Sequence, residues 1–236
     1  MQLKSFSVTG FGPQSVSLAL DLTYPGTSRK HIANGVVTKA VLYGPSGSGK
    51  TTLARALLDI GEALTGRPSG VTGMRIAGGK DDWDAHFRYE FVKGRRVMVY
   101  EYRRGAHGYA ADEVLTFDGD NVPLIPPESR PTWLPGVTPE LEEIMGFASR
   151  MVYLPVDLLR RIPVDTYDWS SLIYIDGFGG GPEQTHLQTA MKLLGTLETQ
   201  VIVATPHSEI EQDDSWPEYC YFTQQDGKVR RGERVV

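Results

Sequence analysis

Residues 39 to 52 read KAVLYGPSGSGKTT, and this segment limits the fold of the chain more than any other. An apolar stretch runs into Gly44, and the residues from Gly44 to Thr51 fit the pattern G-x-x-x-x-G-K-[ST] at every fixed position. The next residues, LARALLDIGEALT, place leucines at helical spacing. We therefore predict a strand, a glycine-rich loop and a helix in succession, which is the arrangement of a phosphate-binding loop.

The residue types in this loop suit a phosphate group. Glycine permits backbone turns that other residues resist, so successive N–H groups and the positive end of the helix can point at phosphate oxygens. We expect Lys50 to reach the β- and γ-phosphates and the Thr51 hydroxyl to ligate Mg2+. The alternative is a Gly/Ser-rich turn that binds nothing. The predicted nucleotide-binding residues are Gly44, Pro45, Ser46, Gly47, Ser48, Gly49, Lys50, Thr51 and Thr52.

Composition allows one substantial domain and argues against several classes of protein. The 236 residues are 40% hydrophobic, enough for a full core, and the formal net charge of −5 argues against a surface that coats DNA. The single cysteine, Cys220, cannot form an internal disulfide and fits a reducing cytoplasm. No apolar stretch approaches the roughly 18 residues of a membrane span, and the N-terminus lacks a signal-peptide core. We expect a cytoplasmic protein with no membrane partner. A nucleic-acid partner is possible, but no feature of the sequence supports one.

Apolar–polar alternation in the N-terminal half of the chain predicts antiparallel strands before and after the glycine-rich loop. Residues 1–22 alternate apolar and polar positions and read as an opening hairpin. Residues 86–104 read as two further alternating strands, and a third strand before an Asp118-Gly119 turn continues this meander. We assign residues 78–125 to an antiparallel β subdomain.

In the C-terminal half of the chain, capping residues and apolar runs predict helices and buried strands. Thr138 and Pro139 provide an N-cap and a first-turn proline, and residues 138–165 are expected to form a reduced helical segment. A helix over 182–197 and a closing hairpin over 218–236 are also expected.

Two apolar runs in this half, SSLIYIDGF and TQVIVATPH, are typical of buried parallel strands. The predicted fold class is therefore α/β, with a mostly parallel sheet flanked by helices, an antiparallel β-meander and a single domain over residues 1–236.

Asp176 and His207 end these two strands and are the candidate catalytic residues. In P-loop proteins an acid at such a strand end holds Mg2+ directly or through water, so we predict that Asp176 joins Thr51 at the metal. An aspartate that only caps the next turn is the alternative. His207 is placed to approach the γ-phosphate, although a lone histidine at a strand end is often an ordinary loop residue.

Together these segments resemble a known family. YGPSGSGKTTLARAL, the RYEF…VMVYEY…EVLTF meander, LIYIDGF and ATPHSEI look like the ABC-type, SMC-related ATPase heads of the AAA-15-like family, which includes OLD-type and PARIS-type antiphage or abortive-infection ATPases. The resemblance implies that Lys50 and Thr51 form the Walker A pair, that Asp176 is the Walker B aspartate, and that His207 is the switch histidine. It also implies ATP and Mg2+ as cofactors, a homodimer or higher homo-oligomer, and an effector partner such as a nuclease or toxin.

The sequence departs from this family at two places. The family carries a glutamate after the Walker B aspartate to polarise the attacking water, but this chain has Gly177, which cannot orient water. Glu183 and His186 are the nearest substitutes. The S-G-G signature expected about 20 residues before Walker B is also missing. The loop from Gly179 to Gly181 looks similar but lies on the other side of the strand, and it is either a modified dimer contact or a plain turn.

These features predict a P-loop NTPase with an ABC-type head that binds ATP, hydrolyses it slowly, and uses its nucleotide state to control self-association or an effector, in antiphage defence. ATP is favoured over GTP because no N-K-x-D motif occurs. A P-loop kinase acting on a small acceptor is one alternative and a RecF-like DNA-repair ATPase is another. The basic residues Arg95, Arg96, Arg103 and Arg104 would serve a kinase lid or a phosphate backbone, although a solvated strand face explains them as well.

Overall fold

The fold is described from a computed structural model, in which the described residues are 1–11, 16–24, 31–67, 85–105, 108–124, 138–156, 170–177, 192–206, 220–225 and 228–231. No helix among them is long and apolar enough to cross a membrane.

Twelve strands form one mixed sheet in the order β10-β11-β12-β5-β13-β14-β2-β1-β6-β7-β8-β9 within the described residues. The first five strands in this order, which end with β13, run parallel to one another. Within the last six, which begin with β2, neighbouring strands run antiparallel. The predicted combination of a parallel sheet and an antiparallel meander is therefore confirmed, and so is the closing hairpin of β13 and β14. The strands are β1 (Gln2–Phe11), β2 (Val16–Asp21), β5 (Lys39–Tyr43), β6 (Ala85–Lys93), β7 (Arg96–Arg104), β8 (Ala110–Phe117), β9 (Asp120–Val122), β10 (Met151–Pro155), β11 (Leu172–Asp176), β12 (Gln200–Thr205), β13 (Cys220–Gln225) and β14 (Lys228–Arg231), and a separate ribbon pairs β3 (Ile32–Ala33) with β4 (Val36–Val37).

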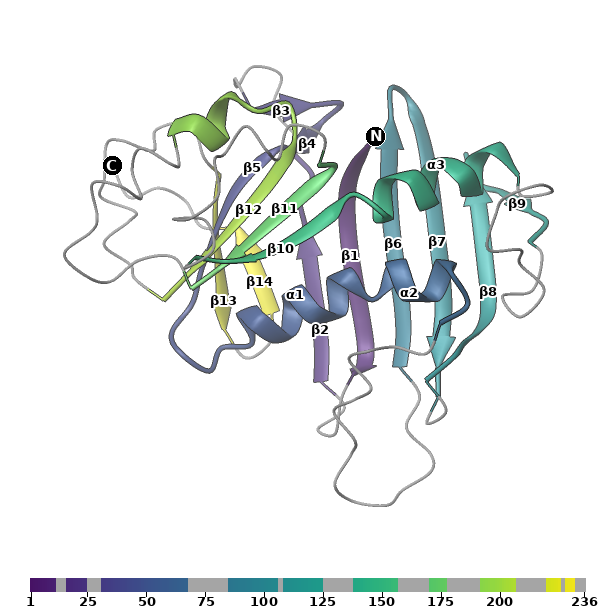
Figure 1. The fold of residues 1–236 in the computed structure, drawn as a ribbon, viewed down its shortest axis with the longest axis horizontal. Helices are drawn as coiled ribbons and strands as arrows, with labels where there is room; N and C mark the ends of the chain where they lie inside the picture. Colours follow the sequence, from purple (N-terminus) through teal and green to yellow (C-terminus); the bar gives the residue numbers. More distant parts are fainter. Residues whose placement is uncertain are drawn as a thin grey trace.

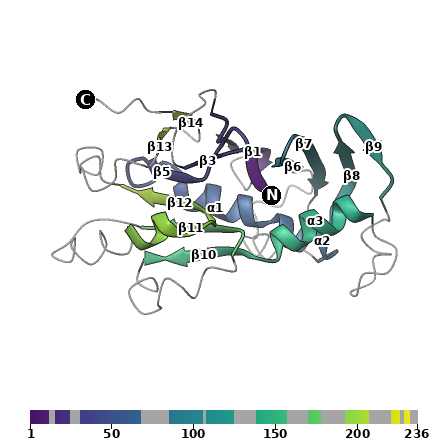
Figure 2. The same ribbon diagram turned by 90° about the horizontal axis from the view of Figure 1, so that it is seen from above.

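The sheet curls around the helix that follows the glycine-rich loop. This helix, α1 (Lys50–Leu58), continues after one residue into α2 (Ile60–Leu64). It contacts β1 on one side and β10 and β11 on the other, so it lies between two limbs of the sheet (Figures 1 and 2). The inward residues of α1, including Leu53 and Leu57, are fully buried. The helix therefore has little freedom to move independently of the sheet.

Aromatic side chains attach the meander to α1. The rings of Phe87 on β6 and Tyr102 on β7 stack with centroids 4.8 Å apart, and Phe6 on β1 packs against Tyr89 at the same distance. The Tyr89 hydroxyl also donates a hydrogen bond to the Ala56 carbonyl of α1, at 3.0 Å. The antiparallel limb is thus bonded to the helix as well as packed against it.

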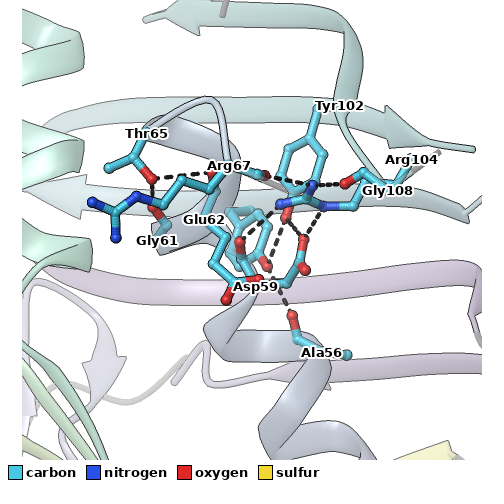
Figure 3. Close-up of polar contacts among 10 residues, drawn as sticks. Ala56, Asp59, Gly61, Glu62, Thr65, Arg67, Tyr102, Arg104 and Gly108 are labelled. Atoms are coloured by element: carbon cyan, nitrogen blue, oxygen red, sulfur yellow. Dashed lines mark hydrogen bonds and ion pairs between the residues drawn. The ribbon is translucent and has the colours of Figure 1, made fainter. Parts of the chain in front are cut away.

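A buried ion pair strengthens this attachment (Figure 3). Asp59, between α1 and α2, accepts hydrogen bonds on Oδ2 from Arg104 Nε at 2.5 Å and from the Tyr102 hydroxyl at 2.8 Å. The guanidinium also donates to the main-chain carbonyls of Arg67 and Gly108. Since the side chains of Asp59 and Arg104 are at most 1% exposed, each charge depends on these partners for compensation.

The segment that was expected to be helical from 138 to 165 contains a strand as well. Thr138 caps α3 (Pro139–Ala148) as predicted, and its hydroxyl accepts from the Leu141 N–H at 3.4 Å. The chain then forms β10, which pairs in parallel with β11. This strand was not predicted from the sequence.

Polar side chains are buried at the end of the parallel strands that lies away from the glycine-rich loop. The Gln200 side chain accepts from the Leu3 N–H and donates to the Leu3 and Val37 carbonyls. Lys39 is only 1% exposed, and its ammonium donates to the carbonyls of Leu197, at 2.8 Å, and Thr199. Burial lowers the pKa of Lys39 to about 8.

Candidate nucleotide-binding site

The glycine-rich segment Gly44–Thr51, hereafter the P-loop, joins the end of β5 to the start of α1. Gly47 and Gly49 have φ values of 82° and 98°, a left-handed conformation that glycine adopts without strain. Gly49 is the N-cap of α1, and no side chain accepts a hydrogen bond from the first N–H groups of the helix. Pro45, Ser46 and Gly47 are exposed, which leaves this backbone accessible from solvent.

Lys50 folds back over the loop that precedes it. Its Nζ donates to the carbonyls of Gly44 and Pro45, at 2.5 and 2.9 Å, and lies 3.3 Å from the Ser48 hydroxyl. Burial lowers the pKa of Lys50, and the Asp176 carboxylate opposes part of that shift. The Lys50 ammonium is thus hydrogen-bonded to the backbone of the P-loop.

Thr51 and Asp176 are 125 positions apart in the sequence but their side chains are in contact. The Thr51 hydroxyl donates to Asp176 Oδ2 at 2.6 Å, so the two residues predicted to share a metal lie side by side. The contact forms because β11 ends beside the first turn of α1, where the Tyr174 hydroxyl also donates to the Lys50 carbonyl at 2.9 Å. A hydroxyl and a carboxylate side by side offer oxygen ligands of the kind that Mg2+ prefers.

Tyr153 adds a second donor to the same carboxylate. Its hydroxyl lies 2.8 Å from Asp176 Oδ2, and its ring stacks on that of Tyr174 with centroids 6.4 Å apart. Burial, followed by the hydrogen bond to Asp176 and the charge of that carboxylate, raises the pKa of Tyr153 to about 12. The hydroxyl therefore stays protonated and donates at neutral pH.

Gly177 occupies the position that carries glutamate in the family that the sequence resembles. Its φ is 81°, and a Cβ added there would meet only Val156 Cγ1, at 3.9 Å. Space is therefore available, but the left-handed backbone disfavours any residue with a side chain. The local conformation, and not crowding, accounts for the glycine.

The remaining predicted site residues lie outside the described residues. These are His207, the loop from Gly179 to Gly181, and the substitutes Glu183 and His186. Two residues before His207 in the sequence, the Thr205 carbonyl at the end of β12 accepts from the Gly44 N–H at 3.1 Å. The strand that leads to the histidine thus ends beside the P-loop.

The four arginines that were considered for a lid or a phosphate backbone do not form one surface. Arg104 is buried against Asp59, and Arg103 pairs with Asp112 at 2.9 Å. The Arg96 guanidinium lies over the Phe117 ring, 4.8 Å from its centroid. Arg95 is exposed. The treatment of these residues as one basic cluster was wrong for Arg104, because that residue shares the inward face of β7 with Tyr102.

Two site residues, Tyr153 and Tyr174, were not predicted from the sequence. Tyr174 lies inside the LIYID run, where alternation with Asp176 on one strand face could have revealed it. Tyr153 had no such signal, because its strand was not anticipated.

No protein-family model matches the sequence, and no curated protein matches it. Among solved structures, the SMC head domain from Thermotoga maritima has a similar fold, with a TM-score of 0.52 and 12% identity over 99% of this chain and 100% of that one. An SMC head bound to the C-terminal winged-helix domain of ScpA gives a TM-score of 0.51 and 10% identity over 98% of each chain. These likenesses show that the chain has the SMC-like, ABC-type ATPase head fold that was expected.

Proposed function

We propose that this chain is an ATP-binding, slowly hydrolysing ABC-type ATPase head whose nucleotide state controls its self-association or its affinity for an effector protein. The observation that carries the proposal is the contact of the Thr51 hydroxyl with the Asp176 carboxylate at the start of α1. At this contact the last residue of the P-loop motif lies beside the carboxylate that ends β11. One sheet carries both the P-loop and the meander, which supports treating residues 1–236 as a single ATPase domain.

The residues present fit Mg-ATP. Thr51 and Asp176 would hold the metal, the P-loop N–H groups and Lys50 would hold the phosphates, and Mg2+ would neutralise phosphate charge when bound. No cluster of three or more His, Cys, Asp or Glu side chains able to hold a metal occurs among the described residues. A two-ligand protein site is typical of Mg2+ that completes its shell with phosphate oxygens and water. ATP is preferred in this proposal because the chain has no N-K-x-D motif for guanine.

Slow hydrolysis follows from Gly177. Without a carboxylate there, no side chain at the usual position orients the attacking water. We therefore propose that the nucleotide acts mainly as a ligand that holds one state of the protein. His207 is proposed to sense the γ-phosphate, since the strand before it ends beside Gly44.

The biological part of the proposal rests on the motif resemblance to AAA-15-like ATPases. We propose an antiphage role with a nuclease or toxin as the effector, and a homodimer or higher homo-oligomer as the responsive state. A kinase lid receives less support, because Arg104 is buried and Arg103 is engaged in an ion pair.

Light scattering of the full chain without nucleotide, with Mg-ADP and with Mg-ATP tests this proposal, together with pull-down of proteins encoded by neighbouring genes. We expect Mg-ATP alone to raise the molecular mass or the affinity for a partner, because a ligand that prefers the associated form shifts the population toward it. His207→Ala should weaken the response while ATP binding is largely kept. Identical behaviour in the three nucleotide states would contradict control by nucleotide.

A further inference from the structure

We propose that Tyr153 is a positioning residue of the metal site, which fixes the Asp176 carboxylate so that one of its oxygens stays free for the metal shell. This inference rests on the proposed function. It assigns a role to a residue on β10, outside the P-loop and outside the strand that carries Asp176.

The two hydrogen bonds that Asp176 accepts from Thr51 and Tyr153 fall on the same carboxylate oxygen. Oδ2 accepts from both the Thr51 hydroxyl, at 2.6 Å, and the Tyr153 hydroxyl, at 2.8 Å. In the described part of the chain no donor is bonded to Oδ1. Two donors from different elements therefore fix the plane of the carboxylate, and both of them bond the same oxygen, Oδ2.

The sheet presents Tyr153 to this position. Tyr153 is the parallel register partner of Tyr174, and Pro155 is that of Asp176, so the tyrosine lies diagonally opposite the carboxylate on the same face. The two tyrosine rings stack at 6.4 Å with an interplanar angle of 20°. Their hydroxyls serve the two halves of the site, because Tyr174 bonds the Lys50 carbonyl while Tyr153 bonds Asp176.

Packing alone does not account for a tyrosine here. Tyr153 is 37% exposed, unlike the fully buried Tyr174, so its ring contributes less to the core. Phenylalanine would keep the stack and lose only the hydroxyl. The second donor also has a specific use, since the Thr51 hydroxyl is itself an expected metal ligand and Tyr153 is not. A group that orients a ligand in this way typically changes metal affinity by about 10- to 100-fold when it is lost.

The test compares the wild type with Tyr153→Phe by calorimetry of ATP binding at a series of free Mg2+ concentrations and in EDTA. In EDTA we expect the two proteins to bind ATP with similar affinity. The Mg2+ concentration that gives half of the metal-dependent gain in ATP affinity should be about tenfold or more higher in Tyr153→Phe. Tyr109→Phe is the matched control, because Tyr109 is 56% exposed on the meander, and it should leave both quantities unchanged. Melting temperatures of both variants check that the fold is kept.

A double-mutant cycle separates positioning from general structure. In an Asp176→Asn background, Tyr153→Phe should have little further effect on the Mg2+ requirement, since the carboxylate that it orients is gone. An unchanged Mg2+ requirement in Tyr153→Phe, or equal weakening of ATP binding with and without Mg2+, would overturn the proposal. If the wild type bound no ATP under either condition, the proposed function itself would be wrong, and that result differs from both of these.

Discussion

Arg104 and Asp59 form a buried ion pair that joins the end of the meander strand β7 to the turn directly after the P-loop helix, with Nε and Oδ2 2.5 Å apart. Tyr102 donates to the same carboxylate oxygen. The core of the antiparallel limb and the position of α1 are therefore coupled through charges that water does not reach.

Removing one partner of this pair should destabilise the protein strongly. Arg104→Met leaves Asp59 buried without its cation, and we expect a loss of about 3–5 kcal/mol in the free energy of unfolding. Urea denaturation provides the measurement. Arg103→Met is the control, because its partner Asp112 is on the surface and such pairs contribute at most about 1 kcal/mol.

Replacing both partners should cost much less than the sum of the single changes. In Asp59→Leu combined with Arg104→Met, no unpaired charge remains in the interior. Additive losses in the double variant would show that the two side chains act independently and would refute the coupling.

Lys39 should make stability depend on pH in the alkaline range. Its pKa is about 8 in the folded protein and near 10.5 when exposed, so the unfolded chain binds more protons between these values. Stability from this group therefore rises as pH increases from about 8 to 10.5, by at most on the order of 3 kcal/mol. Below pH 8 the cost of the buried charge is constant.

Urea unfolding of the wild type and of Lys39→Met at several pH values isolates this effect. The difference between the two unfolding free energies should move in favour of the wild type as the pH rises from 8 to 10. Buried tyrosines titrate in both proteins and cancel in the difference. Parallel pH profiles would mean that Lys39 keeps an ordinary pKa.

Gly177→Ala should lower stability by about 1–2 kcal/mol, because a Cβ is strained at a φ of 81°. Gly177→Glu should lower stability by the same amount. Because the backbone is strained there, we do not expect this substitution alone to speed up ATP hydrolysis. Gly146→Ala, in the interior of α3 with open space around the new Cβ, should instead stabilise by about 0.5–1 kcal/mol. Thermal unfolding of the two alanine variants measures this contrast, and shifts of the same sign would argue against the backbone explanation.

Local patterns in the sequence predicted much of the fold. The strand, loop and helix around Lys50, the meander over β6 to β9 and the cap at Thr138 all follow from residue types at fixed spacing, and the structure contains them. The contact of Thr51 with Asp176 could be predicted as well, because parallel strands end at one edge of a sheet.

Long-range pairing was harder to predict. β10 has five residues after a helix, and only its register with β11 brings Tyr153 to Asp176. Burial of Arg104 had a local signal, since the period of two along β7 places it on the face of Tyr100 and Tyr102. Its partner Asp59 lies 45 positions earlier, and nothing local to either residue indicates that they meet.

Calorimetric titration of Mg-ATP into the wild type and into Lys50→Ala tests the central claim most directly. We expect the wild type to bind ATP and the variant, still folded by circular dichroism, to lose measurable binding, because its loop no longer presents the Lys50 ammonium to the phosphates. Equal ATP affinity in the two proteins, or none in the wild type, would contradict the assignment of the P-loop as a nucleotide site.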